Sequence, residues 1–438
     1  MTAPHPNFRV DVYQNEYLHE GAREVNAIVT VVSSAGSADG GQAPVDSSVA
    51  AAEVIIVDCS GSMDYPRGKM IAARQATAAA IDALRDGVAF AVIAGTDQAR
   101  LVYPQQPGLV PADARTRAAA KSAVSNLKAG GGTAIGRWLA LANTLFAGHS
   151  NAIRHAILLT DGRNEHERPE DLARTLSVCE GVFVCDCRGV GTDWEVEELR
   201  RVATALLGTV DIVADPAGLA ADFRAMTAAA MSKAVADVVL RLWTPQGAGV
   251  KFVKQVAPEM ADLTARRVAV GAQVGDYPTG SWGSESRDYH VCVEVKAAGV
   301  GDVMLAGRVS LVLKGGGQDE VLGQGLVKAM WTDDMVLSTR INPEVAHYTG
   351  QAELADVIQE GLEARKTGDL DTATAKLGRA VALATETGNA DTAALLARVV
   401  DIDDPVTGTV RLKAKVSDVD TMTLDTRSTK TSRVRKNS

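Results

Sequence analysis

Asp58, Ser60 and Ser62 form the pattern D-x-S-x-S directly after a short apolar run. This pattern offers one carboxylate and two hydroxyls on a tight turn, and oxygen ligands of that kind suit a hard divalent cation. Two distant segments add to it, since a Gly-Gly-Gly-Thr stretch ends in Thr133 and a Leu-Leu-Thr-Asp-Gly stretch contains Asp161. These side chains together predict a site for Mg²⁺, with Mn²⁺ or Ca²⁺ as alternatives.

The predicted cation would keep part of its charge, because only two of these side chains are carboxylates. An octahedral site of this kind can leave one position for an outside oxygen, and a carboxylate from a protein partner is the ligand we expect there. Each motif alone has an ordinary interpretation, as a helix N-cap or as a turn. Their occurrence in order, each after a predicted strand, favours the metal site.

Residues 49–234 must position these motifs, and they alternate short apolar strands with helices. This pattern predicts a parallel, doubly wound, Rossmann-like α/β sheet, in which ligands bind at the carboxyl ends of the strands. The predicted strands are 53–57, 89–94, 99–103, 155–160, 181–186 and 210–213, and the predicted helices are 69–84, 112–127, 134–146, 169–179, 195–203 and 218–234.

The segments around this α/β domain have other patterns. Residues 1–48 contain a β-rich run and a linker, and 235–342 contain strands with glycine-rich turns, which predicts an antiparallel β-sandwich. The sandwich either follows the α/β domain or receives it as an insertion. Residues 343–403 predict about three helices. Residues 404–438 are rich in Thr, Ser, Arg and Lys without an apolar face, which predicts a flexible, disordered tail. The predicted sandwich strands are 235–243, 251–256, 267–270, 289–295, 304–313 and 321–331.

Composition excludes several classes of protein. The chain has 438 residues, 46% of them hydrophobic, and a net charge of −9, so we expect no unspecific binding of nucleic acid. It has no apolar run long enough to span a membrane and no signal-peptide pattern at the N-terminus, so we expect a cytoplasmic protein. The five scattered cysteines are expected to be reduced, buried thiols.

Motifs for catalysis are missing. The sequence contains no G-x-x-x-x-G-K-[ST] and no G-x-S-x-G, so no enzyme activity is expected. Glu165, His166 and Glu167 lack the second His of H-E-x-x-H, and we interpret them as a charged loop at the rim of the metal site.

Residues 50–232 closely resemble the von Willebrand factor type A (VWA) domain. Its metal-ion-dependent adhesion site is D-x-S-x-S, a later Thr and a later Asp, and all of these positions match here. Further similarity lies in Gly68-Lys69-Met70 and in the stretch 190–194. The resemblance implies that Ser60 and Ser62 bind metal directly, that Thr133 and both Asp residues bind directly or through water, and that the function is binding rather than catalysis.

The whole chain is similar to intracellular bacterial members of this family that carry a flanking β-sandwich, a helical segment and a Thr/Arg-rich tail. This implies a signalling context with serine/threonine kinases and forkhead-associated (FHA) domain proteins. A phosphate on such a tail would create a charged mark that Arg clusters read. The candidate phosphoacceptors are Thr421, Thr423 and Thr426, then Thr429 and Thr431. The alternatives are a merely solvated terminus, or a basic tail that docks onto the acidic body or onto nucleic acid.

The sequence thus favours an Mg²⁺-dependent protein-binding module, an adaptor or assembly protein regulated through its tail. One alternative, permitted by the resemblance, is the partner subunit of an AAA+ ATPase of the chelatase or MoxR type. Another is a metal-assisted hydrolase, for which the sequence supplies no convincing general base.

Overall fold

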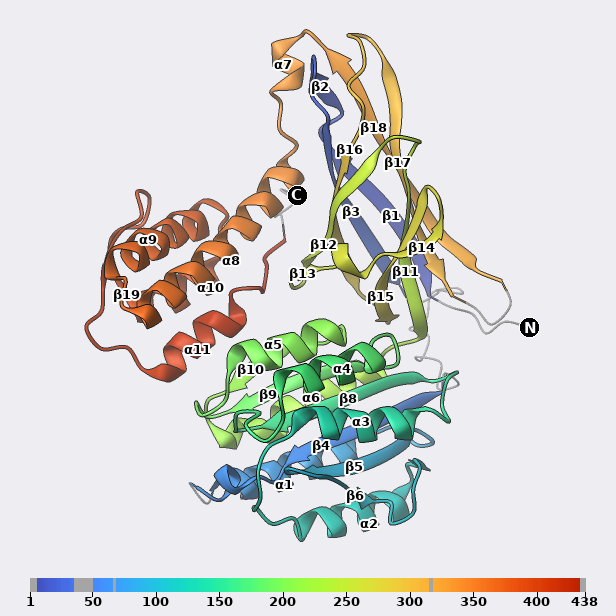
Figure 1. The fold of residues 1–438 in the computed structure, drawn as a ribbon, viewed down its shortest axis with the longest axis vertical. Coiled ribbons are helices and arrows are strands. Elements are labelled where there is room, and N and C mark those ends of the chain that lie inside the picture. Colours follow the sequence, from blue (N-terminus) through green and yellow to red (C-terminus); the bar gives the residue numbers. More distant parts are fainter. Residues whose placement is uncertain (1–5, 35–49, 66–67, 315–317, 434–438) are drawn as a thin grey trace, which may run out of the picture. The chain divides into compact units, whose positions relative to one another are not determined.

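The computed structural model describes residues 6–34, 50–65, 68–314 and 318–433. Most of the predicted linker before residue 49, and the last five residues of the predicted tail, lie outside the described residues. The chain divides into two compact units, one formed by residues 44–236 and the other by 1–43 together with 237–438 (Figure 1).

The first unit is built on one sheet with the strand order β10-β9-β8-β4-β5-β6, and β7 also pairs with β5. Strands β10, β9, β8, β4 and β5 run parallel, and β6 is antiparallel to β5. The strands are β4 (Ala51–Asp58), β5 (Ala89–Gly95), β6 (Ala99–Tyr103), β7 (Val110–Pro111), β8 (Ile153–Thr160), β9 (Val184–Val190) and β10 (Val210–Val213).

Helices cover both faces of this sheet (Figure 1). All eight residues of the central strand β4 are buried, and alternate side chains of a strand point to opposite faces. Ile55 packs in one core with Met70 and Phe223, while its neighbour Ile56 is fully buried on the other face. The helices are α1 (Gly68–Ala83), α2 (Ala114–Ser125), α3 (Ile135–Phe146), α4 (Pro169–Cys179), α5 (Val196–Ala205) and α6 (Leu219–Met231), with short 3₁₀ turns η1 (Gly61–Asp64) and η2 (Pro216–Gly218).

The second unit contains two sheets, with orders β1-β3-β16-β12-β13 and β14-β15-β11-β17-β18-β2. The neighbours in the first sheet are antiparallel, as are β14–β15, β11–β17 and β17–β18 in the second, whereas β2 runs parallel to β18. Phe8 of β1 contacts the buried Trp282 of β15, so side chains of the two sheets interdigitate. The strands are β1 (Asn7–Gln14), β2 (Tyr17–His19), β3 (Glu24–Ser34), β11 (Val235–Trp243), β12 (Gly249–Ala257), β13 (Ala261–Asp262), β14 (Val268–Gly271), β15 (Val274–Trp282), β16 (Ser286–Glu294), β17 (Val303–Leu313) and β18 (Glu320–Thr332), with the 3₁₀ turn η3 (Thr264–Arg266).

The N-terminal strands belong to these sheets, because β3 pairs with β16 along its length. The α/β unit therefore enters the chain between β3 and β11.

A helical segment follows the sheets. After the short α7 (Met335–Ser338) come α8 (Pro343–Thr367), α9 (Leu370–Glu386) and α10 (Ala390–Val399). Helix α8 ends at Gly368, whose φ of +86° is the left-handed conformation that terminates many helices. Buried side chains of α8, α9 and α10 share one core that includes Leu377 and Leu396.

The prediction of a disordered tail is wrong for residues 404–433. Strands β19 (Val400–Asp404) and β20 (Thr409–Leu412) form a hairpin, and helix α11 (Asp418–Arg427) follows it. Leu424 is fully buried in the core of the helical segment, and Ser417 caps α11 by accepting a hydrogen bond from Asp420 N. The polar composition of this segment hid two buried apolar side chains, Val410 and Leu424, and a helix cap, which together order it.

Candidate metal centre

Asp58 ends β4 and is completely buried at the carboxyl edge of the sheet. Its Oδ1 accepts a hydrogen bond of 2.7 Å from Ser60 N, which turns the chain sharply after the strand. Ser60 Oγ then lies 3.0 Å from Ser62 Oγ, and Ser62 Oγ donates to Asp161 Oδ1 over 2.7 Å. The turn thus reaches the loop after β8.

Three hydroxyls meet around Gly162. A Cβ built on this glycine would lie 3.2 Å from Ser62 Oγ, 3.3 Å from Thr133 Oγ1 and 3.8 Å from Ser60 Oγ. A side chain here would crowd the hydroxyls of Ser62 and Thr133, so glycine keeps the space between the three hydroxyls open. The structure therefore brings together the side chains that the sequence motifs predicted, from three separate loops.

Backbone hydrogen bonds hold two of these loops against each other. Gly61 N donates to Gly131 O over 3.0 Å, and Gly130 N donates to Cys59 O over 2.8 Å. Gly131 has a φ of +85°, a conformation that side-chain-bearing residues rarely adopt. Cys59 N also donates to Gly95 O at the end of β5 over 2.7 Å, which ties the turn to the neighbouring strand.

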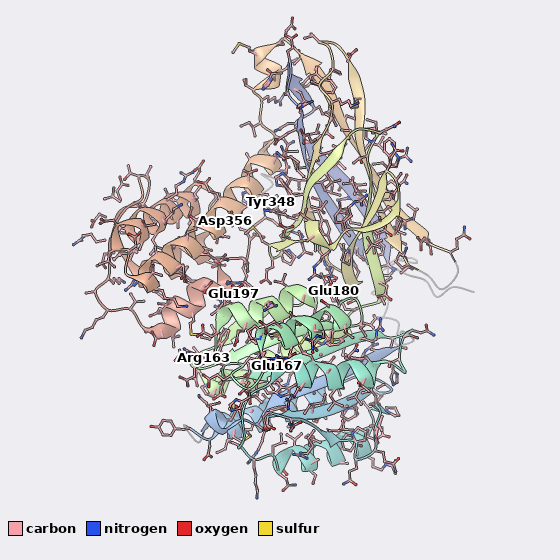
Figure 2. The ribbon with its side chains drawn as sticks, in the orientation of Figure 1. Arg163, Glu167, Glu180, Glu197, Tyr348 and Asp356 are labelled. Atoms are coloured by element: carbon pink, nitrogen blue, oxygen red, sulfur yellow. The ribbon has the colours of Figure 1, made fainter. Side chains whose placement is uncertain are left out.

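The loop after β8 is joined to the start of α3. Asn164 Oδ1 accepts from Ile135 N over 2.8 Å, and Glu167 Oε2 accepts from Gly136 N over 2.8 Å. His166 Nδ1 accepts from Thr133 N over 3.2 Å. Residues 165–167 therefore lie beside Thr133, as expected for a charged loop at the rim of the site, and His166 and Glu167 also accept hydrogen bonds from backbone donors there. Figure 2 labels Glu167.

Sequence reasoning missed two residues of the centre. Thr160 Oγ1 donates to Asp58 Oδ2 over 2.5 Å, and Lys69 Nζ donates to Asp161 Oδ2 over 2.7 Å. Thr160 is a polar residue at the end of an apolar strand. Because Val57 pairs with Leu159, Thr160 lies beside Asp58, and this position could have indicated its role from the sequence. The role of Lys69 depends on how α1 lies against the loop, which no local pattern reveals.

The charges of the centre influence each other. Burial raises the pKa of Asp58 to about 6, although hydrogen bonds from Ser60 and Thr160 oppose this shift. Burial lowers the pKa of Lys69, but hydrogen bonds and charge interactions with Asp161 and Asp193 outweigh it and raise the pKa. Two buried carboxylates beside one ammonium leave a net negative site, and a cation placed among the hydroxyls would favour the ionised form of Asp58.

The donor set fits a hard divalent cation. It consists of hydroxyl and carboxylate oxygens, without sulfur or imidazole among the converging groups. Among the described residues, no group of three or more His, Cys, Asp or Glu side chains could hold a metal ion. A metal centre in the described part of the chain would therefore rely on Ser and Thr hydroxyls, as this one does.

The candidate phosphoacceptors lie in α11 and after it. Thr423 and Thr426 are buried inside the helical segment, and Thr426 Oγ1 donates to Met422 O over 2.9 Å. Thr421, Thr429 and Thr431 are partly exposed. Of the five candidate phosphoacceptors, only these three are partly accessible to a kinase in the folded chain.

No helix among the described residues is long and apolar enough to cross a bilayer.

Two family models and a solved structure that match this chain all carry the same family description. The von Willebrand factor type A domain family matches residues 52–212, and the von Willebrand factor type A C-terminal domain family matches 382–428. A solved structure described as von Willebrand factor type A from Catenulispora acidiphila is 56% identical, with 98% of both chains covered and a TM-score of 0.93.

Two further relatives are more distant. The ArnB paralog VWA2 from Sulfolobus acidocaldarius has a TM-score of 0.60 at 13% identity, with 96% of this chain and 98% of that chain covered, and shows the fold alone. A Synechocystis sp. protein, sll0103, is 32% identical over 222 residues. That match covers 48% of this chain and 50% of the relative, so the chain spans about half the length of this curated relative.

Proposed function

The chain belongs to the von Willebrand factor type A family, and on that premise we propose that it is a protein-binding module that works through a divalent cation. The cation we propose is Mg²⁺, held by the oxygens of the candidate metal centre. When bound, it would supply a positive charge with a position open to an outside oxygen. A carboxylate on the partner protein is the group this position would take.

One observation carries the proposal. The hydroxyls of Ser60, Ser62 and Thr133 converge around Gly162, next to the buried carboxylates of Asp58 and Asp161. Hydroxyls are neutral ligands, so only the two carboxylates would reduce the charge of a bound cation. We assign Ser60 and Ser62 to direct ligation and the other three to ligation directly or through water.

The surroundings of the site also suit a protein partner. Tyr65 follows η1 and is 84% exposed, and its N donates to Ser62 O over 3.1 Å. An exposed aromatic side chain beside a charged centre is typical of interface anchors.

The same geometry argues against a hydrolase. A general base near the cation would need a free lone pair, and His166 is the imidazole that lies beside Thr133. Its Nδ1 accepts from Thr133 N, so the proton of the neutral ring is on Nε2, which is then a donor. Glu167 Oε2 accepts hydrogen bonds from both Gly136 N and Asn164 Nδ2, so this carboxylate has a structural role at the start of α3. We therefore propose binding rather than catalysis.

We further propose that the protein is a cytoplasmic adaptor whose C-terminal segment is regulated by phosphorylation and read by an FHA-domain protein. Thr421, Thr429 and Thr431 are the candidates, because Thr423 and Thr426 are buried. Mass spectrometry of the protein from its native cells should find phosphate on these three positions. High coverage of 418–433 without phosphate would remove this part of the proposal.

The metal-binding part is tested with Asp58→Asn, compared with Asp64→Asn, which changes an exposed carboxylate of the same turn. We expect calorimetric titration with Mg²⁺ to show a loss of affinity of at least roughly tenfold for Asp58→Asn and no loss for Asp64→Asn. Partners crosslinked in native cells should be recovered with Mg²⁺ and lost with EDTA. Equal recovery in both conditions would contradict the proposal.

A further inference from the structure

Residues 428–433, named here the clasp, leave α11 and run along the edge of a sheet. Met260 N donates to Thr429 O over 2.8 Å, and Thr431 N donates to Pro258 O over 3.1 Å. These partners lie in the connection between β12 and β13. The backbone of the clasp therefore pairs like an added strand, which is a common way for proteins to bind extended peptides.

Side chains of the clasp also form hydrogen bonds with residues at the edge of the sheet. Thr429 Oγ1 donates to Glu259 Oε1 over 3.0 Å, and Thr431 Oγ1 donates to Val256 O over 2.6 Å. A hydroxyl is needed at each position to make these contacts.

Helix α8 forms the opposite wall. His347 Nε2 donates to Ser432 O over 2.7 Å, and Gln351 Nε2 donates to Ser432 Oγ over 3.0 Å. Gln351 is itself buried, and its Oε1 accepts from Asn389 Nδ2 over 3.1 Å, which fixes its orientation. The clasp thus lies in a groove with prearranged polar groups on both sides.

The groove ends at a buried carboxylate. Asp288 is 4% exposed, and its Oδ2 lies 3.4 Å from Arg433 Nε and also accepts from the hydroxyl of Tyr348, which Figure 2 labels. Within the described part of the chain, Asp288 Oδ1 has no hydrogen-bond partner. A guanidinium can bind both oxygens of a carboxylate at once, so Arg433 uses only part of what this site offers.

We infer that the groove between the β12–β13 edge and α8 is a peptide-binding site for an extended, Ser/Thr-rich segment that carries an arginine. In this chain the site is filled by residues 428–433. The clasp is therefore an exchangeable ligand of its own protein, and a segment that places an arginine on both oxygens of Asp288 would displace it. This inference is independent of the metal centre.

The connection through α11 gives the clasp a large advantage over a free peptide, since a tethered segment has a high effective concentration at its site. A free peptide with the clasp's own sequence will therefore not displace the clasp of the wild-type chain. Weakening the clasp within the full chain makes exchange observable.

The experiment uses full-length chains with Arg433→Glu and, separately, Thr431→Val. Lys415→Glu is the matched control, because it reverses an exposed charge in the same C-terminal region outside the clasp. Hydrogen exchange of the Thr431 and Met260 amides is measured, together with the fluorescence anisotropy of a labelled peptide of residues 426–438. Thermal melting verifies that each variant remains folded.

In the wild-type chain and the control, we expect the Thr431 amide to exchange at least tenfold more slowly than the same amide in the free peptide, and we expect no peptide binding. In Arg433→Glu and Thr431→Val, exchange of both amides should accelerate at least tenfold, and the peptide should bind. A Thr431 amide that exchanges as fast in the wild-type chain as in the free peptide would overturn the inference. So would folded variants that exchange faster but bind no peptide.

Discussion

Lys69 gives the candidate metal centre a cation of its own. The side chain is almost completely buried, lies 2.7 Å from Asp161 Oδ2, and reaches Asp193 Oδ2 at 3.1 Å. A buried carboxylate without a nearby positive charge is costly. The ammonium therefore keeps Asp161 ionised and in place in the absence of a divalent ion.

Replacing Lys69→Met should make the fold depend on metal. Without a divalent cation, Asp161 would be a buried carboxylate without a positively charged partner, and we expect a loss of about 3–5 kcal/mol in the free energy of unfolding. Mg²⁺ should raise the melting temperature of this variant more than that of the wild-type chain, because the repulsion from the ammonium is gone. Melting curves with EDTA and with Mg²⁺ measure both effects. The control is Lys121→Met, which removes an exposed pair with Asp82; equal melting of Lys69→Met and this control in EDTA would contradict the prediction.

A second buried charge cluster lies across three strands of the same sheet. His155 Nδ1 lies 3.0 Å from Glu53 Oε2, and His155 Nε2 lies 3.0 Å from Asp186 Oδ2. Burial lowers the pKa of His155, but the charges and hydrogen bonds of Glu53 and Asp186 outweigh this and raise it from 6.5 to about 10.

This shift predicts a pH dependence of stability. The pKa of His155 is higher in the folded chain, so the charged ring stabilises the fold fully below about pH 6.5, and this contribution is lost as the pH rises towards 10. His155→Gln should cost about 3–5 kcal/mol near neutral pH, and the difference from wild type should shrink above pH 8. Denaturant titrations from pH 6 to 10 measure that difference, and a constant difference over this range would refute the assignment.

At the level of elements, the motifs were predictable because Asp58 ends an apolar strand, Asp161 directly follows one, and Thr133 follows a glycine run just before a helix. To predict that the side chains of Asp58, Thr133 and Asp161 lie together, it was enough to assume that the strands run parallel. Strand β15 was not predicted, because Pro278 and Gly280 in its interior are typical of turns. Gly280 has a φ of +73° there, so the strand is irregular where the sequence indicated a loop.

The C-terminal segment could not be predicted for a different reason. Thr429 and Thr431 are polar residues of a kind found in disordered tails, yet their hydroxyls bind groups more than 150 residues away. Such long-range partners leave no local pattern in the sequence.

The end of β5 supports the metal centre through a close contact. A Cβ on Gly95 would lie 2.4 Å from the Trp138 ring, while Gly95 O accepts from Cys59 N. Gly95→Ala should therefore push Trp138 or the strand away and cost about 1–3 kcal/mol. Gly148→Ala, where no atom lies within 4 Å, is the control. Denaturant titration of both variants checks the prediction, and equal stability would contradict it.

At the scale of the whole molecule, the two units have separate cores, and the α/β unit carries the whole candidate metal centre. Residues 44–236 produced alone should therefore fold cooperatively and bind Mg²⁺ with an affinity within a few-fold of the full chain. Calorimetry and circular dichroism test this. An excised unit that is folded but unable to bind Mg²⁺ would show that the centre needs residues from elsewhere.

Because the α/β unit is inserted after β3, the ribosome synthesises the sheet partner of β3 much later than β3 itself. Strand β3 ends at Ser34, but its sheet partner β16 begins only at Ser286. At roughly 5–20 residues per second, the ribosome needs on the order of tens of seconds to produce that partner. During this interval the nascent β1–β3 hairpin exposes an unpaired edge, a template for wrong pairing with other chains. This edge of β3 becomes covered only when β16 has been synthesised and has paired with it.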